Sequence, residues 1–457
     1  MSGPCAGRFR PLSVPRDTRP IVKFTGEFGA AIDQHLRDAA DGRWDTPVGI
    51  LIDPQNPESI AHWVYKSINP LVRGAKLPGT DVEALLEPFM HNRFELLPEG
   101  FTIETEVSMS ASGDLMATPG LDGARDRLFL DVDDLIFGAD ISYANLESTL
   151  TEAALGPTEF SAGKTPMINL TPDQYETVVS HRGRKFDVLH LANNHILDCG
   201  EEGVQTTLAR LKQDGIAQVG VNQTEGDALM PRITELAGLR IGWVAHTFSV
   251  NFKPFPDGKP WIVNMTAFHL VPDPDIRPIL AQIKACREAG CDLVIAAMHW
   301  GMEFELFPTS QQIDWAHQFA EAGADLVIGH HPHVPQPVEI YRLKRDPGCA
   351  VPILYSIGNL STLLSHPAMV LSLVARIGLV KGRYRGKVET RIASLELTPV
   401  ALVAEADRAD EIVRLVPLAQ LDRSVKAGSM RDYVDDVARF ADLVIGDDWR
   451  GDALVSA

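Results

Sequence analysis

The sequence predicts a layered α/β domain. From Thr102 onward, short apolar runs alternate with loops and amphipathic segments, which is the pattern of strands and helices that pack as layers. Several of these runs end in carboxylate, amide or imidazole side chains, and an α/β sheet presents such side chains to a ligand at its strand ends. The length of 457 residues suffices for one large catalytic domain with smaller flanking pieces.

The chain divides into four parts. Residues 1–20 are rich in Pro and Arg with little periodicity, which predicts a loose tail. Residues 21–100 form an N-terminal extension that could be a lid, a dimer contact or a second lobe. Residues 101–400 carry the α/β pattern, and residues 401–457 form a C-terminal appendage with an acidic helix over 431–445.

Within the central part, short apolar runs predict strands, and apolar residues that recur on one face predict helices. The predicted strands are 187–191, 239–246, 293–298, 326–328 and 353–359, the last with a tight turn, and the predicted helices are 202–212, 276–289 and 311–322. Two helix-to-strand units follow each other, and each ends in histidine. This order places His299 and the cluster at 330–333 on one rim of a sheet.

The charge and composition exclude several classes of protein. With 61 acidic and 42 basic side chains, the formal charge of −19 repels phosphate backbones, so no nucleic-acid partner is expected. No apolar stretch approaches the ~20 residues of a membrane helix, and the first residues contain no apolar signal core. We therefore expect no membrane span and a cytoplasmic location, unless a leader is missing. Five scattered cysteines favour neither a disulfide framework nor a thiolate zinc site.

Histidines at two neighbouring strand ends predict a metal site. His331 and His333 alternate along the chain, with Pro332 stiffening the turn, so both imidazoles point toward one volume. His299 ends the preceding strand, and neighbouring strand ends lie only ~5 Å apart. A single histidine in such a place is usually buried against a backbone carbonyl. Three together favour a bound metal instead.

Oxygen ligands at other strand ends complete a set suited to divalent cations. Asp114 follows an apolar run and Gly113, which lets the backbone turn. Glu147 follows another apolar run and could bridge two ions. Asn194 and His195 follow the strand 187–191 and offer a ligand beside a proton donor. Taken singly, these residues have ordinary alternatives: a turn for Asp114, a solvated charge for Glu147 and a helix cap for the Asn-His pair.

Six motifs between Val107 and Asn359 carry a resemblance to a known family: SGDLM, ANLE, LANNHILDCGEEGVQTTL, MHWGMEFE, GADLVIGHHPHVPQPVE and YSIGNL. In this order they resemble the CapA or PgsA-type proteins of poly-γ-glutamate capsule biosynthesis, a branch of the calcineurin-like metallophosphoesterase superfamily. The resemblance implies a four-layer α-β-β-α sandwich with a metal centre at the sheet edge, and hence a metal-dependent hydrolase. It implies nothing about the chain outside that span.

The resemblance also implies roles for individual residues. Asp114 and His333 would hold a first ion, Asn194, His299 and His331 a second, and Glu147 would stand between them. His195 would be the general acid near the leaving group, oriented by Asp198 or Glu201. Met116 stands where many metallophosphoesterases have a histidine, and its thioether is a poor ligand for Mg, Mn or Zn. The first site is therefore weakly filled, completed by water or His330, or empty.

The expected cofactor is one or two divalent ions among Mn, Zn, Mg and Fe, which would activate water against a phosphate ester or a γ-glutamyl amide. Lys164, Arg182 and Arg184 are candidates for binding an anionic small molecule or polymer, together with His330, although solvated charge is the ordinary role of surface cations. The alternative function is a non-catalytic scaffold or binding component of a capsule polymer assembly, with a degenerate metal site, and Met116 favours it. A homo-oligomer is compatible with the sequence.

Overall fold

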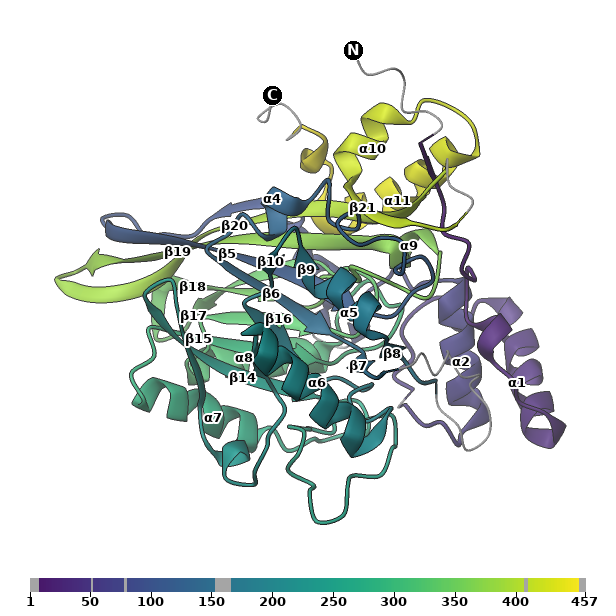
Figure 1. Ribbon diagram of the computed structural model, residues 1–457, viewed down its shortest axis with the longest axis horizontal. Helices are drawn as coiled ribbons and strands as arrows, with labels where there is room; N and C mark the ends of the chain where they lie inside the picture. Colours follow the sequence, from purple (N-terminus) through teal and green to yellow (C-terminus); the bar gives the residue numbers. More distant parts are fainter. Residues whose placement is uncertain (1–7, 51, 78–79, 153–165, 407–409, 452–457) are drawn as a thin grey trace.

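Two β-sheets packed face to face form the centre of the protein (Figure 1). The computed structural model describes residues 8–50, 52–77, 80–152, 166–406 and 410–451. Within them the larger sheet has nine strands, in the order β1 (Phe9–Arg10), β20 (Lys387–Glu405), β19 (Leu371–Tyr384), β5 (Thr102–Leu115), β6 (Ile141–Leu146), β11 (Val188–His190) and β12 (Ala217–Val219), with β4 (Arg93–Glu95) and β21 (Val413–Pro417) also paired to β20.

The smaller sheet has six strands in the order β13 (Arg232–Leu236), β14 (Leu239–Thr247), β15 (Leu293–His299), β16 (Leu326–His330), β18 (Asp346–Leu354) and β17 (Val338–Leu343). Both sheets are mixed, and each contains a block of parallel strands: β5, β6, β11 and β12 in one, and β14, β15, β16 and β18 in the other. The sheets meet through side chains such as Tyr143 and Trp243, whose rings stack 5.4 Å apart.

Helices cover the outer faces of the two sheets. α7 (Arg277–Glu288) and α8 (Ser310–Ala322) pack on the smaller sheet, whereas α9 (Pro367–Val370), α10 (Leu418–Ser424) and α11 (Ser429–Ile445) pack on β19 to β21 (Figure 1). Further helices are α3 (Val82–Leu86), α4 (Asp133–Ile136), α5 (Pro172–Val179) and α6 (Gly200–Asp214). Short strands also pair outside the two large sheets: β2 (Lys76–Leu77) with β3 (Thr80–Asp81), β7 (Thr149–Leu150) with β8 (Asn169–Leu170), and β9 (Ser180–His181) with β10 (Arg184–Lys185). The predicted mixed α/β architecture is confirmed.

Local sequence signals account for where the predicted elements begin and end. The helix expected over 311–322 is α8, which starts after a capping box formed by Thr309 and Gln312. The helix expected over 202–212 is α6, which ends at Gly215 in the left-handed conformation, φ 72°. The strand expected over 326–328 continues to His330. No helix in the described part of the chain combines the length and apolarity that a membrane crossing demands.

The flanking pieces are more closely joined to the core than expected. Residues 8–20 do not form a loose tail, because β1 pairs with β20 and Leu12 and Val14 are buried in the main core. The expected boundary at residue 400 falls inside β20, and β21 extends the same sheet. The apolar residues of the tail are scattered among prolines and arginines, so no periodicity reveals an edge strand there.

The N-terminal extension forms a helical hairpin beside the main body (Figure 1). It consists of α1 (Gly26–Asp38) and α2 (Pro57–Ile68), which share a small separate core. The buried residues of that core are Ile32, Ala39, Trp44, Ile60, Ala61 and Val64. After α2 the chain is tied to the loop that follows β15, since the Leu71 N–H donates to Phe304 O at 2.9 Å and the Leu306 N–H donates to Leu71 O at 2.9 Å.

Candidate metal centre

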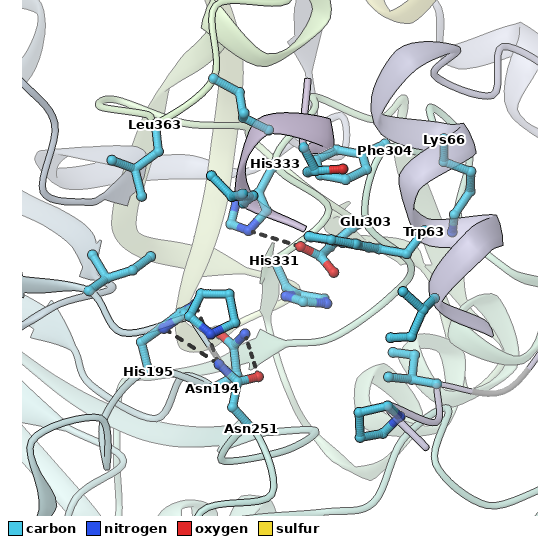
Figure 2. A pocket seen from close by; sticks show the side chains of 18 of the residues that line it. Trp63, Lys66, Asn194, His195, Asn251, Glu303, Phe304, His331, His333 and Leu363 are labelled. Atoms are coloured by element: carbon cyan, nitrogen blue, oxygen red, sulfur yellow. Dashed lines mark hydrogen bonds and ion pairs between the residues drawn. The ribbon is translucent and has the colours of Figure 1, made fainter. Parts of the chain in front are cut away.

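The carboxyl ends of the parallel strands in both sheets converge on one edge of the molecule, where a cavity of about 300 Å³ opens (Figure 2). Asp114 and Asn145 lie at the ends of β5 and β6, and His299 and His330 end β15 and β16. Asn194, His195, His331 and His333 line the cavity. The strand ends therefore bring together residues that lie far apart in the sequence.

Asp114 reaches its position through a break in strand pairing. The register between β5 and β6 shifts between Ala111 and Asp114, and the Asp114 N–H donates to Gly358 O at 3.0 Å. A Cβ on Gly113 would lie only 2.0 Å from Gly358 O, so the backbones could not approach this closely with any other residue. The absence of a side chain at Gly113 therefore allows the close approach that positions the Asp114 carboxylate.

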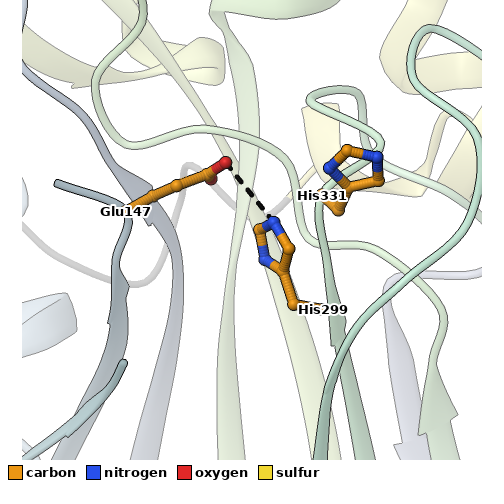
Figure 3. Close-up of side chains that lie close together, drawn as sticks. All are labelled: Glu147, His299 and His331. Carbon is orange, nitrogen blue, oxygen red and sulfur yellow. Dashed lines mark ion pairs between the residues drawn. The ribbon is translucent and has the colours of Figure 1, made fainter. Parts of the chain in front are cut away.

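Two overlapping groups of buried side chains have the geometry of a metal site. One contains Asp114, Glu147 and His333, and the other contains Glu147, His299 and His331, and in each group the ligand atoms lie within 4.8 Å of one another. Figure 3 shows Glu147, His299 and His331, with Glu147 Oε1 3.4 Å from His299 Nε2. The same oxygen is 3.8 Å from His333 Nε2. Glu147 belongs to both groups and would therefore be shared if each group held a cation.

Several ligand atoms in these groups have no other partner. Within the described residues, Glu147 Oε1 and both ring nitrogens of His331 are buried without a hydrogen bond. Burying such atoms unpaired costs about 1–3 kcal/mol each. His331 and His333 also adopt left-handed backbone conformations, with φ of 97° and 58°, which residues other than glycine rarely adopt. A divalent cation would pair these atoms, so the donor set fits a metal.

Burial strongly affects the protonation states of the two groups. Burial raises the pKa of Glu147 well above its ordinary value, and the charge of Asp114 adds to this. Burial also lowers the pKa values of His299 and His331 well below the ordinary value, which keeps both imidazoles neutral. For Asp114, burial acts upward, but the charge and hydrogen bond of His330, together with His333 and His299, outweigh it and hold the pKa well below the usual range. Neutral imidazoles and carboxylates are the forms that bind cations. His299, His331 and Asp114 are therefore in the binding form, whereas Glu147 and His333, whose pKa values are raised, would release protons when a cation binds.

Asn194, His195 and Asp198 form a polar chain on one side of the cavity. Asn194 Oδ1 lies 2.8 Å from His299 Nε2, and its Nδ2 donates to Asn251 Oδ1 at 3.1 Å. His195 Nδ1 lies 2.6 Å from Asp198 Oδ2, which also accepts from the Ile168 N–H. Of the two carboxylates expected to orient His195, the structure thus selects Asp198. Glu201 instead forms an ion pair with Lys259.

Of the four residues expected to bind substrate, the structure describes three, and none of these three lines the cavity. His330 does not line the cavity, because its Nδ1 bonds Asp114 Oδ1 at 2.7 Å, its Nε2 bonds the Tyr143 hydroxyl at 3.0 Å, and the ring is buried. It supports Asp114 from behind. Arg182 lies in the exposed turn between β9 and β10, near the start of the parallel strands rather than their ends. Neighbouring Arg184 pairs there with Asp133. Lys164 lies outside the described residues.

Three further residues contact Asp114 or His333, and the sequence alone assigned them no role. Asn145 Nδ2 donates to Asp114 Oδ1 at 2.8 Å, and Asn359 Oδ1 lies 2.9 Å from His333 Nδ1. Glu303 Oε1 lies 3.7 Å from His333 Nε2, and burial raises its pKa. Each residue stands in one of the motifs ANLE, YSIGNL and MHWGMEFE, and its position after a strand was the available signal. Met116 lines the cavity beside them and offers only its thioether.

Comparison with known proteins identifies the family. The model of the bacterial capsule synthesis protein PGA_cap matches residues 108–362, which is more than half of the chain. The PGA biosynthesis protein CapA of Bacillus subtilis is 32% identical over 186 residues, 40% of this chain and 44% of that protein. A probable polyglutamine synthesis accessory protein of Mycobacterium tuberculosis is 32% identical over 228 residues, 48% of this chain and 55% of that protein. The capsule biosynthesis protein CapA of Bacillus anthracis is 31% identical over 188 residues, 40% of this chain and 42% of that protein.

The matched region contains every residue of the two metal-binding groups. The chain spans about half the length of the curated relatives it matches. The helical hairpin and the last strands lie outside the matched region. The chain belongs to the PGA_cap family of bacterial capsule synthesis proteins.

Proposed function

We propose that this protein is a metal-dependent hydrolase. The observation that supports the proposal best is the set of buried atoms without a hydrogen bond, Glu147 Oε1 and both nitrogens of His331, at the overlap of two ligand groups. A purely structural cluster of this kind would leave the cost of burial uncompensated. Bound cations would both compensate it and give the edge of the sheets a chemical role.

The proposed ligand assignment follows the two groups. Asp114 and His333 hold a first ion, Asn194, His299 and His331 hold a second, and Glu147 serves both. The ions are Mn, Zn, Mg or Fe, since carboxylate, amide oxygen and imidazole suit all of these. With Met116 offering no hard donor, the first position has fewer protein ligands and binds its ion more weakly. When bound, such ions acidify a water molecule and stabilise negative charge on the electrophile.

The chain's own residues supply the proton. His195 lines the cavity next to the second ion position, and Asp198 holds its ring through Nδ1. We assign His195 as the general acid that protonates the leaving group from Nε2, with Asp198 as its positioning residue. Figure 2 shows His195 and Asn194 side by side on the same flank of the cavity.

The proposed architecture is the four-layer α-β-β-α sandwich of the metallophosphoesterases. The two face-to-face mixed sheets, with helices on both outer faces and ligands at the shared strand ends, support it. The names of the relatives support a part in capsule or poly-γ-glutamate metabolism. The bond cleaved is then a phosphate ester or a γ-glutamyl amide.

Metal analysis combined with hydrolysis assays tests the proposal. The protein is loaded with Mn, freed of excess ion and analysed for metal content, and then assayed on a phosphomonoester, a phosphodiester and a γ-linked glutamate oligomer. We expect one to two ions per chain and turnover of one substrate class. Phosphate release selects the ester, and glutamate release selects the amide. Bound metal without turnover of any of them contradicts hydrolysis.

A second candidate is a non-catalytic scaffold within a capsule polymer assembly. Met116 in the first ion position favours it, as does the word accessory in the name of the relative from Mycobacterium tuberculosis. This candidate predicts no bound metal after loading, which the same elemental analysis decides.

A further inference from the structure

The cavity beside the metal-binding groups has a second wall that comes from the N-terminal part of the chain. This wall contains apolar residues of the segments before α2 and of α2 itself: Val14, Ile21, Ile50, Ile52, Ile60 and Trp63. Met116, Phe304 and Met369 from the main body face the same space. Figure 2 shows Trp63 on one side of the cavity and His195 on another. The N-terminal wall lies outside the region shared with the family, residues 108–362.

Specific contacts hold this wall in place. The Lys66 ammonium lies 2.7 Å from Glu305 Oε1, and only 3% and 5% of the two side chains are exposed. Thr18 bonds Ser67 at the end of α2, and the Ser365 N–H donates to Pro15 O at 2.8 Å. The wall is therefore a built part of the site rather than a segment lying loosely over it.

The charges around the cavity do not suit an anionic polymer. Imidazoles aside, Lys66 is the only basic side chain among the described residues that line it, and Glu305 already neutralises this lysine. Asp53 and Glu303 add carboxylates to the lining. His62 lines the same wall, and burial lowers its pKa to about 2, so it stays neutral. Carboxylates of a polyglutamate chain would find no spare cation among the described residues of this wall.

We propose that this N-terminal wall forms a specificity pocket for an apolar group, so that the substrate carries an alkyl or aryl moiety next to the bond that is cleaved. The inference rests on the proposed function, because it names the substrate class of that site. The reacting group binds at the metal-binding groups, and the apolar moiety extends toward Ile60 and Trp63. An apolar cavity of about 150 Å³ holds benzene, so about 300 Å³ accommodates a group of up to roughly two rings or a short alkyl chain.

Matched pairs of small probes test the pocket on the Mn-loaded full-length protein. One pair is hexylphosphonate and methylphosphonate, and the other is γ-glutamylhexylamide and γ-glutamylglutamate, with dissociation constants measured by calorimetry. We expect the hexyl compound to bind at least tenfold more tightly in one pair or in both. Equal affinities in both pairs, tighter binding of the polar compound, or no binding of any probe overturns the inference.

Two pocket variants and one control locate the effect. Trp63→Ala removes the centre of the wall, and Phe252→Ala removes a rim residue that is 53% exposed and tolerates truncation. Both variants should reduce the hexyl preference to less than threefold; because the preference is a ratio measured within each variant, a change that affects both probes equally cancels. Leu229→Ala alters a side chain that is 79% exposed and does not line the cavity, so it should change nothing. An unchanged hexyl preference in both pocket variants contradicts the proposed pocket.

Hydrolysis of hexyl phosphate and methyl phosphate, and of the two γ-glutamyl amides, separates this inference from the proposed function. If no compound is hydrolysed but hexyl binding depends on Trp63, the pocket stands and the hydrolase fails. If hydrolysis occurs without a hexyl preference in binding or in kcat/KM, the hydrolase stands and the pocket fails.

Discussion

His331 and His195 lie at the same cavity, but their ring nitrogens are in different situations. Both nitrogens of His331 are buried and unpaired, and its backbone is left-handed. His195 has its Nδ1 fixed by Asp198 at 2.6 Å. An unpaired neutral ring is suited to binding a cation, and a ring fixed through one nitrogen is suited to transferring a proton through the other. The two histidines should therefore respond differently to substitution.

His331→Ala should abolish binding of the second ion and hydrolysis while the fold survives. The lost contacts with Phe248 and His299 are offset by removal of two unpaired nitrogens, so we expect the free energy of unfolding of the metal-free protein to change by no more than about 1 kcal/mol. Elemental analysis and urea unfolding measure the two effects, and Asn194→Ala should also lose metal. A variant that keeps its full metal content would show that His331 is not a ligand.

His195→Ala should lower kcat by roughly 10²–10⁴-fold and leave the metal content nearly unchanged, because a general acid contributes about that much. Asp198→Asn should cause a smaller loss and shift the pH profile of kcat, since it alters the partner of Nδ1. Steady-state kinetics on the active substrate class and elemental analysis are compared for both variants. If His195→Ala strips the metal, the assignment of the general acid is wrong.

The sequence identifies the histidine cluster, but it does not show which of the histidines face the cavity. His330, His331 and His333 lie within four positions, and only the structure shows that β16 includes His330 and turns its ring toward Tyr143. The left-handed conformations of His331 and His333 then direct the other two rings to the cavity. These conformations depend on tertiary contacts, and no local pattern in the sequence predicts them.

At the scale of elements, a buried ion pair joins α2 to the main body. Lys66 on α2 meets Glu305 in the loop after β15, and Leu71 pairs with the same loop through backbone hydrogen bonds. That loop also carries Glu303, which lies beside His333. The helix and the metal-binding edge are thus joined through one short stretch of chain.

Lys66→Met should destabilise the protein by about 3–5 kcal/mol, because it leaves the Glu305 carboxylate buried without its partner. The double variant Lys66→Met/Glu305→Met should recover most of this loss, since neither charge is then buried. Urea unfolding gives the free energies. Lys284→Met is the control: its pair with Glu288 is 74% and 66% exposed and should change the free energy by less than about 1 kcal/mol. Equal effects of the two single variants would contradict a dominant role for burial.

Most elements of the central part could be predicted, whereas the pocket wall could not. The strands β14, β15 and β16 and the helices α6, α7 and α8 carry clear periodicities with caps or glycines at their ends. Ile60 and Trp63 lie on an amphipathic helix, and an apolar residue that lines a cavity has the same sequence pattern as one that fills a core. Only the packing of α2 against the loop after β15 distinguishes the two cases.

For the whole molecule, buried neutral histidines should set the acid limit of stability. Away from the metal-binding groups, burial lowers the pKa of His246 and His366 to about 4, of His269 to about 3 and of His62 to about 2. His246 is additionally held between Thr266 and Gln282 at 3.0 Å each. In the unfolded chain these imidazoles regain the ordinary pKa of about 6.5.

Unfolding should therefore become easier as the pH falls from about 6.5 to 4, because the unfolded chain then binds protons that the folded protein cannot. Each such histidine contributes a slope of about 1.4 kcal/mol per pH unit within that window, and none above it. Urea unfolding between pH 7.5 and 4.5 in the presence of EDTA measures the slope without interference from metal. His246→Gln should flatten it by one histidine's share. A stability independent of pH over this range would contradict the prediction.

In the proposed function, substrate selection and chemistry come from different parts of the chain. The metal-binding groups lie in the region shared with the family, whereas one wall of the cavity comes from residues before it. Replacing the N-terminal helical hairpin with a different segment would change which substrates fit the cavity, and it would leave the metal-binding side chains unchanged. Divergence of substrate preference among related proteins can thus proceed by replacement of one terminal segment, with no alteration of the histidines.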